Sequence, residues 1–110
     1  MAWLLRGGEV LASIDVVTSR RAALRSVAAD GSSGAPAAIA SGTLAVHGLG
    51  GRRGADVAYL DADLVVLRGS HLARGGADRA RGRAHSVLVA EAGSFDRWAL
   101  RAGDVLELKE

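Results

Sequence analysis

The stretch that decides the fold is Asp56-Val57-Ala58-Tyr59-Leu60-Asp61-Ala62-Asp63-Leu64-Val65-Val66-Leu67. It predicts two apolar strands joined by a turn at residues 61–63, because aspartate side chains accept hydrogen bonds from turn amides. The apolar side chains alternate in two sets. One set comprises Val57, Tyr59, Val65 and Leu67, and the other comprises Ala58, Leu60, Leu64 and Val66. Since both faces are apolar, we expect this hairpin to lie in the centre of a sheet.

Toward the N-terminus, the pattern predicts a second hairpin and a helix. Gly7-Gly8 suits a tight turn between strands at Ala2–Arg6 and Glu9–Val17, because both glycines accept a positive φ. Thr18 or Ser19 can cap a helix that runs to about Ala29. Residues 37–46 are weakly patterned and can hold one or two short strands.

Toward the C-terminus, residues 68–84 lack apolar periodicity, and we expect a long excursion with an edge strand near Arg79. Residues 86–90 form an apolar strand. Ser94 can cap a short helix that carries Phe95 and Trp98 as core anchors, and Gly103 can end it. A last strand is expected over residues 104–109.

These elements predict a β-rich α+β fold in a single domain spanning residues 1–110. We expect six to eight short strands in a curved antiparallel or mixed sheet, which could close into a small barrel, with two short helices.

Composition excludes several classes of protein. The chain has no cysteine, which excludes disulfides, thiolate zinc sites, iron–sulfur clusters and a cysteine nucleophile. The net charge of +2 is too small to indicate a nucleic-acid partner, and the basic tract lacks aromatic residues for base stacking. The arginines of that tract are Arg68, Arg74, Arg79, Arg81 and Arg83. No apolar stretch is long enough for a signal peptide or a membrane span, so we expect a cytoplasmic protein without a membrane partner.

The candidate catalytic residues are His47 and Asp56. His47 ends a strand immediately before a glycine-rich loop, and Asp56 opens the central strand immediately after it. Because the two lie within reach of each other along the chain, they can form a His–Asp pair that transfers a proton. Alternatively, the same pair can have a structural role and hold the loop in one conformation.

The loop from Gly48 to Gly54 is a candidate ligand or anion site, because bare backbone N–H groups can cradle a phosphate. The residues that would form it are Gly48, Gly50, Gly51, Arg52 and Arg53. A strand follows where a dinucleotide site requires a helix, so an ordinary surface loop is the alternative. His71 and His85 are expected to be structural, and the spacing of the histidines predicts no metal site and no cofactor.

The C-terminal half resembles the bacterial family called domain of unknown function 192. The resemblance is carried by Asp56-Val57-Ala58-Tyr59-Leu60-Asp61, Ala90-Glu91-Ala92-Gly93, Trp98-Ala99-Leu100 and Gly103-Asp104. His47, Asp56, Gly93, Gly103 and Asp104 occupy the family's motif positions. The chain departs from the family at Gly51, Arg53 and Ala55, where the family has a methionine, an aromatic residue and an isoleucine. The resemblance implies a small β-rich domain with a site near His47 and Asp56, and it implies no reaction.

The sequence therefore favours a non-enzymatic binding or accessory domain whose partner is a protein or a small molecule. The alternative is an enzyme in which His47 and Asp56 act beside the glycine loop.

Overall fold

In the computed structural model of the chain, the described residues are 2–17, 37–41, 45–47, 54–73, 75–80 and 82–110. They form nine strands and one short helix. The elements are β1 (Ala2–Arg6), β2 (Glu9–Val17), β3 (Ala37–Ser41), β4 (Ala45–His47), β5 (Ala55–Leu60), β6 (Val66–Leu72), β7 (Ala77–Arg79), β8 (Ser86–Glu91), α2 (Ser94–Trp98) and β9 (Leu106–Lys109). The expected helix over residues 18–29 lies outside the described residues.

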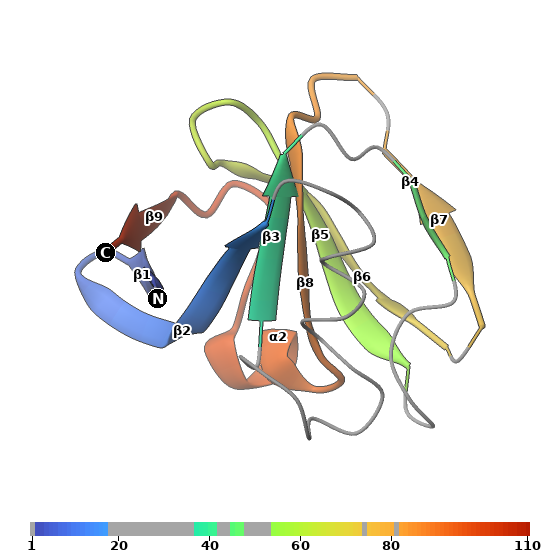
Figure 1. Cartoon of the computed structure of the whole chain (residues 1–110), viewed down its shortest axis with the longest axis horizontal. Helices are drawn as coiled ribbons and strands as arrows, with labels where there is room; N and C mark the ends of the chain where they lie inside the picture. Colours follow the sequence, from blue (N-terminus) through green and yellow to red (C-terminus); the bar gives the residue numbers. More distant parts are fainter. Residues whose placement is uncertain (1, 18–36, 42–44, 48–53, 74, 81) are drawn as a thin grey trace.

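Seven strands form one mixed sheet in the order β6-β5-β8-β3-β2-β1-β9 (Figure 1). The β2/β3 pair is parallel and the other pairs are antiparallel. The short strands β4 and β7 pair with each other in a separate sheet. The predicted β-rich fold is therefore confirmed, and the strand count exceeds the predicted six to eight by one within the described part of the chain.

The large sheet curls into a half-barrel that closes at one end. Val65 and Val105 form an isolated antiparallel bridge between the segments that begin β6 and β9. The backbone N–H of Val66 donates to Asp104 (2.8 Å), and that of Leu106 donates to Leu64 (3.0 Å). The two outermost strands thus meet at this end, while α2 lies at the lower end of the sheet in Figure 1.

The main core lies inside the curl. Its buried apolar residues are Ala2, Leu4, Ile14, Ala37, Ile39, Ala58, Leu60, Val66, Leu88, Ala90, Trp98 and Leu106. Trp98 brings α2 into this core, with Phe95 packed against it at a ring-centroid distance of 5.8 Å, as predicted for these two anchors. A helix of five residues does not persist without such packing, so the core holds α2 in place.

The predicted hairpin forms, with one correction to its register. All six residues of β5 are buried, and Asp61 accepts hydrogen bonds from the backbone of Asp63 and Val65, as expected for the turn. However, a β-bulge in β6 shifts the register by one residue, so that Arg68 lies opposite Tyr59. The prediction that Leu67 shares a face with Tyr59 is therefore wrong, because the bulge inserts an extra residue at this point.

The predicted excursion over residues 68–84 begins later than expected, because strand β6 continues to Leu72. A short strand was expected near Arg79, and β7 lies there, at Ala77–Arg79. Polar side chains concealed the C-terminal part of β6, because an edge strand exposes much of its surface and needs no apolar alternation.

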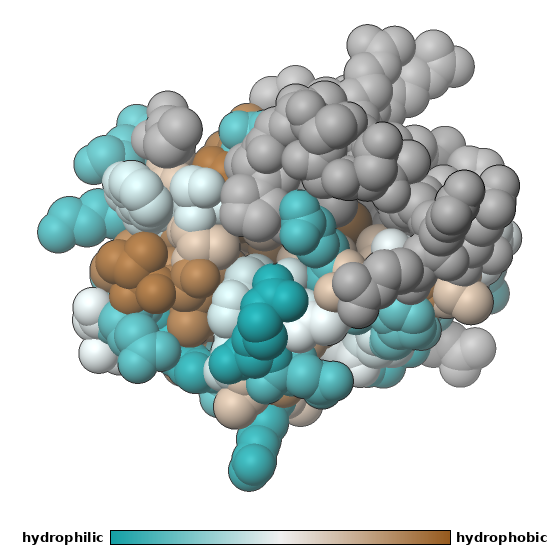
Figure 2. Space-filling view, turned by 90° about the horizontal axis from the view of Figure 1, so that it is seen from below, coloured by the Kyte–Doolittle hydropathy of each residue, from teal (hydrophilic) through white to brown (hydrophobic). Residues whose placement is uncertain are grey.

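Exposed apolar side chains gather on the part of the molecule formed by β1, β2 and β9 (Figure 2). Trp3, Val10, Val16 and Val105 are the exposed large apolar residues of the described chain. A second cluster of buried apolar residues, separate from the main core, lies on the other face of the large sheet and includes Val57, Tyr59 and Val89.

Candidate functional site

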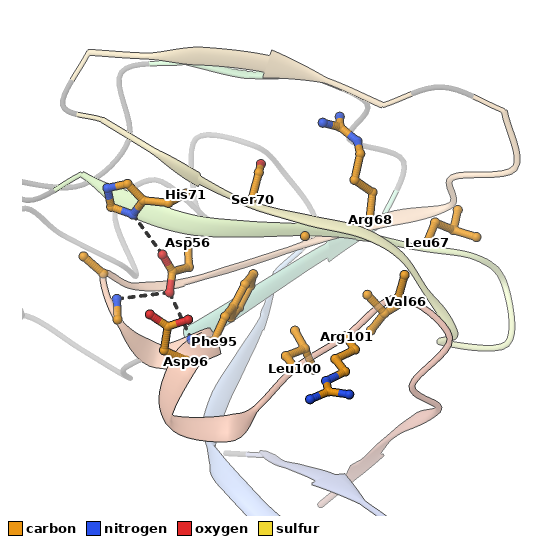
Figure 3. Close-up of a pocket in the computed structure, with 14 residues that line it drawn as sticks. Asp56, Val66, Leu67, Arg68, Ser70, His71, Phe95, Asp96, Leu100 and Arg101 are labelled. Carbon is orange, nitrogen blue, oxygen red and sulfur yellow. Dashed lines mark hydrogen bonds and ion pairs between the residues drawn. The ribbon is translucent and has the colours of Figure 1, made fainter.

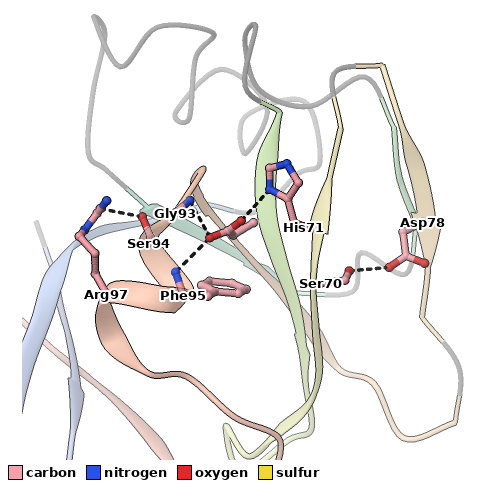
Figure 4. Close-up of polar contacts among 8 residues, drawn as sticks. Ser70, His71, Asp78, Gly93, Ser94, Phe95 and Arg97 are labelled. Atoms are coloured by element: carbon pink, nitrogen blue, oxygen red, sulfur yellow. Dashed lines mark hydrogen bonds and ion pairs between the residues drawn. The ribbon is translucent and has the colours of Figure 1, made fainter.

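Asp56 is a buried carboxylate that forms three hydrogen bonds. It lies on β5 and is 5% exposed. Its Oδ2 accepts hydrogen bonds from the backbone N–H groups of Gly93 (3.1 Å) and Phe95 (3.0 Å), and its Oδ1 lies 3.0 Å from His71 Nδ1 (Figure 4). A buried carboxylate is costly unless its oxygens are hydrogen-bonded, and these three donors meet that requirement.

Asp56 therefore provides the N-terminal cap of α2 from a neighbouring strand. The prediction that the Ser94 side chain caps this helix is wrong: Gly93 occupies the N-cap position with a φ of 92°, and no side-chain cap comes from the helix itself. Ser94 is fully buried, and its Oγ accepts a hydrogen bond from Arg97 (3.1 Å). The helix ends at Trp98, with Ala99 as the C-cap, so the prediction that Gly103 ends it is also wrong.

His71 is the histidine that contacts Asp56. The two residues are cross-strand partners of β5 and β6, and the imidazole is about half exposed, at 52%. An ionised carboxylate only accepts hydrogen bonds, so Nδ1 carries the proton of this contact. In the neutral ring Nε2 is then left with a free lone pair.

A pocket of about 660 Å³ opens between β6 and the segment that contains α2 (Figure 3). Its lining residues are Asp56, Val66, Leu67, Arg68, Gly69, Ser70, His71, Ala92, Gly93, Phe95, Asp96, Leu100, Arg101 and Ala102. The Phe95 ring lies against Gly69, where an added Cβ would be 3.5 Å from it. The volume lies within the range typical of small-molecule sites, and the lining combines apolar and charged groups as such sites do.

A second ionic cluster lies next to Arg101, which lines the pocket. Asp104 accepts hydrogen bonds from the backbone N–H of Arg101 (2.9 Å) and from the Arg6 guanidinium (3.0 Å). The Arg101 N–H, together with Arg6, outweighs the effect of burial and lowers the pKa of Asp104. Arg6 also donates to the carbonyl oxygen of Trp98 (2.6 Å), which ties β1 to the end of α2.

A third cluster lies on the opposite face of β6. Arg68 Nη2 lies 3.0 Å from Asp78 Oδ2 and its guanidinium stacks 5.2 Å from the Tyr59 ring centroid. Burial alone would raise the pKa of Asp78, but hydrogen bonds from Arg68, Arg79 and Ser70 lower it. Burial and the nearby Asp78 charge raise the pKa of Tyr59 to about 12. This cluster attaches the small β4/β7 sheet to the large sheet.

Of the predicted site residues, the structure describes Asp56 and the backbone of His47. Asp56 lies in the pocket, whereas His47 belongs to β4, where its backbone pairs with Ala77 of β7. The loop residues Gly48, Gly50, Gly51, Arg52 and Arg53 lie outside the described residues, so the His47–Asp56 contact and the anion loop stay predictions. Sequence reasoning assigned His71 a structural role, because its position opposite Asp56 depends on the bulge in β6.

Two classes of site are absent from the part of the chain that the structure describes. No group of three or more His, Asp or Glu side chains there is arranged to hold a metal ion. No helix among the same residues is long and apolar enough to cross a membrane.

The fold and site define a β-rich half-barrel domain with one short capped helix. No protein-family model matches the chain, and no curated protein matches it in sequence. Among solved structures, it is similar to a bacterial protein of unknown function from Novosphingobium aromaticivorans DSM 12444, with a TM-score of 0.68. The match covers 96% of this chain and 82% of the other, at 13% sequence identity, and so it shows a shared fold alone.

Proposed function

We propose that the chain is a non-enzymatic binding domain and that the pocket between β6 and the α2 segment is its ligand site. The observation that supports this proposal is the pocket itself, which combines the Phe95 ring and Leu100 with the polar groups of His71, Asp96 and Arg101. Such a lining gives a ligand apolar contact area and a few polar groups to fix its orientation.

The hydrogen bonding of Asp56 favours binding over catalysis. Its Oδ2 is occupied by two backbone donors and its Oδ1 by His71, so its described contacts hold the wall of the pocket in place. Ser70 also lines the pocket, but its Oγ donates to Asp78 Oδ2 at 3.5 Å, and the lowered pKa of Asp78 makes that carboxylate a weak base. A nucleophile needs an adjacent base to react.

A fragment screen followed by two-dimensional amide NMR tests this proposal. We expect binding fragments to shift the resonances of Gly69, Phe95 and Arg101 together. Ala102→Tyr places a large side chain in the pocket and should abolish these shifts, while Ala77→Tyr, on exposed β7 outside the pocket, should leave them unchanged. Fragments that bind both variants equally, or no binding by any fragment, would count against the proposal.

A second candidate function is proton transfer by His71, supported by the 3.0 Å contact with Asp56. A buried carboxylate that accepts from Nδ1–H orients the imidazole and fixes the neutral tautomer in which the Nε2 lone pair can accept a proton. In this form of the enzyme hypothesis His71 takes the role first assigned to His47. Turnover of a bound fragment that is lost in His71→Gln but retained in His47→Gln would select it.

We also propose that the chain is a divergent relative of the domain of unknown function 192 family. Of the motif residues, Asp56 and Gly93 line the pocket, and Asp104 accepts from the backbone of Arg101, which also lines it; these positions support the assignment. Solving the structure of a member with the full motif tests it, because the same carboxylate should cap the same short helix there. The cytoplasmic location stays a prediction.

A further inference from the structure

The backbone edge of β6 borders the pocket. Six consecutive residues of this strand, 66–71, line it, although successive side chains of a strand point to opposite faces. Because the pocket contacts residues from both faces of β6, it lies along the edge of this strand and not over one face of the sheet. β6 is at one end of the sheet order, and β5 is its strand neighbour there.

The alternation of β5 indicates which backbone groups of β6 face the pocket. The carbonyl oxygen of Leu60 accepts a hydrogen bond from the residue just before β8, so Leu60 points toward β8. Backbone groups alternate along a strand, so Val57 points toward β6. Its partner Ser70 then points back toward β5, and the flanking residues Gly69 and His71 present their N–H and C=O groups to the pocket. Among the described residues these groups have no partner across the pocket.

At one end of the pocket, here called the closed end, the edge of β6 is already paired. The N–H of Gly103 donates to Val66 there (2.7 Å), so a chain lying along β6 cannot continue past this point. Arg101 lines the pocket two residues before Gly103. Its charge helps to lower the pKa of Asp104, but Asp104 forms its ion pair with Arg6, and among the described residues Arg101 has no ion-pair partner.

We propose that the edge of β6 binds the carboxyl-terminal segment of another polypeptide as an added antiparallel strand, with the terminal carboxylate at Arg101. The inference rests on the proposed binding function and names the class of partner. Unpaired strand edges accept extended peptides through main-chain hydrogen bonds, and Gly69 and His71 supply four such groups. A chain terminus suits the closed end, and its negative charge complements Arg101.

The test uses a library of random nine-residue peptides with free carboxyl termini, and the tightest binder is then synthesised in several forms. Amidation of its C-terminus should weaken binding about tenfold or more, as should Arg101→Gln in the protein. The matched control is Arg83→Gln, an exposed arginine outside the pocket, which should have no effect. Methylation of single peptide N–H groups should weaken binding at alternate positions only, because every second N–H faces β6.

The variant Gly69→Pro removes one N–H that faces the pocket and should weaken peptide binding about tenfold or more. The N-methylated peptides test the same main-chain hydrogen bonds on the wild-type protein, so the result does not depend on whether Gly69→Pro folds. Peptide binding that responds to neither amidation nor alternate methylation would overturn the inference, as would pairing of two copies of the chain through β6. Fragment binding without any peptide binding would overturn it and leave the proposed function standing, whereas the absence of both would overturn both.

Discussion

Replacement of Asp56 measures how much of the domain depends on one carboxylate. In Asp56→Ala the backbone N–H groups of Gly93 and Phe95 lose their acceptor in a partly buried setting. Each unsatisfied group costs about 1–3 kcal/mol, so we expect a loss of about 2–6 kcal/mol in the free energy of unfolding. For a domain of 110 residues this corresponds to a fall in Tm of about 8–24 °C.

Asp56→Asn should cost less, about 1–2 kcal/mol. The amide oxygen can still accept from both backbone donors, and its NH₂ group can donate to Nδ1 of His71 in the other tautomer. The substitution removes the negative charge, and hydrogen bonds to a charged acceptor are about twice as strong as bonds between neutral groups. His71→Gln should cost no more than about 1 kcal/mol, because the imidazole is half exposed.

The assay is urea unfolding followed by tryptophan fluorescence, since Trp98 is the last residue of α2 and is buried in the core. Asp96→Ala and Asp96→Asn are the matched controls, because Asp96 is an exposed carboxylate of the same helix and should change stability by about 0.5 kcal/mol or less. If Asp56→Ala destabilises the protein no more than Asp96→Ala does, the assignment of Asp56 as the cap of α2 is refuted.

Three further predictions follow from the described side chains. Tyr59, the single tyrosine, should titrate in tyrosinate absorbance at about pH 12 in the native protein and near 10.0 in urea, so stability falls as the pH rises between these values; a native midpoint near 10.0 would contradict its burial. Gly54→Ala should destabilise the fold by about 3 kcal/mol or more, because a Cβ there overlaps the Leu72 carbonyl at a φ of 76°, whereas Gly8→Ala, at a positive φ in open space, should cost about 1 kcal/mol in the same urea assay. Since the pKa of Asp104 is lowered in the folded state, its contribution to stability should disappear as the pH falls below about 4, and Asp104→Asn should show a flatter acid limb in urea unfolding between pH 3 and 6; parallel curves would refute this.

The two hairpins could be predicted because their signals are local. Gly7 and Gly8 both adopt the positive φ that the turn requires, at 58° and 83°. The predicted alternation holds along β5, where Ala58 and Leu60 belong to one core cluster and Val57 and Tyr59 to the other. Such patterns depend on neighbours a few residues apart, which the sequence displays directly.

The pairing of Asp56 with His71 could not be predicted, because it depends on the bulge in β6. Leu60 pairs with Val66 at the turn, and a regular ladder continued from that pair would place Asp56 opposite Ser70. The extra residue at Leu67 moves the register by one and brings His71 onto the face of Asp56. No glycine or proline marks this bulge in residues 64–68.

The cap of α2 was missed for a related reason. Sequence reasoning looks for a cap immediately before a helix, and Ser94 fits that position. The acceptor used instead is Asp56, which precedes Gly93 by 37 residues in the chain and is brought to it by the β5/β8 pairing. A contact of this kind depends on tertiary structure, so no local motif indicates it.

Four residues that carry the family resemblance have structural roles in the backbone of this fold. Gly93 and Gly103 adopt φ values of 92° and 95°, which side chains rarely tolerate, and Asp56 and Asp104 accept backbone N–H groups of the segment between them. Any chain that fills one end of a half-barrel with a short helix has these requirements, whatever it binds. A resemblance at these positions therefore supports the fold, whereas a ligand of the proposed site would be selected by the pocket side chains His71, Phe95 and Arg101, and their substitution is the informative experiment.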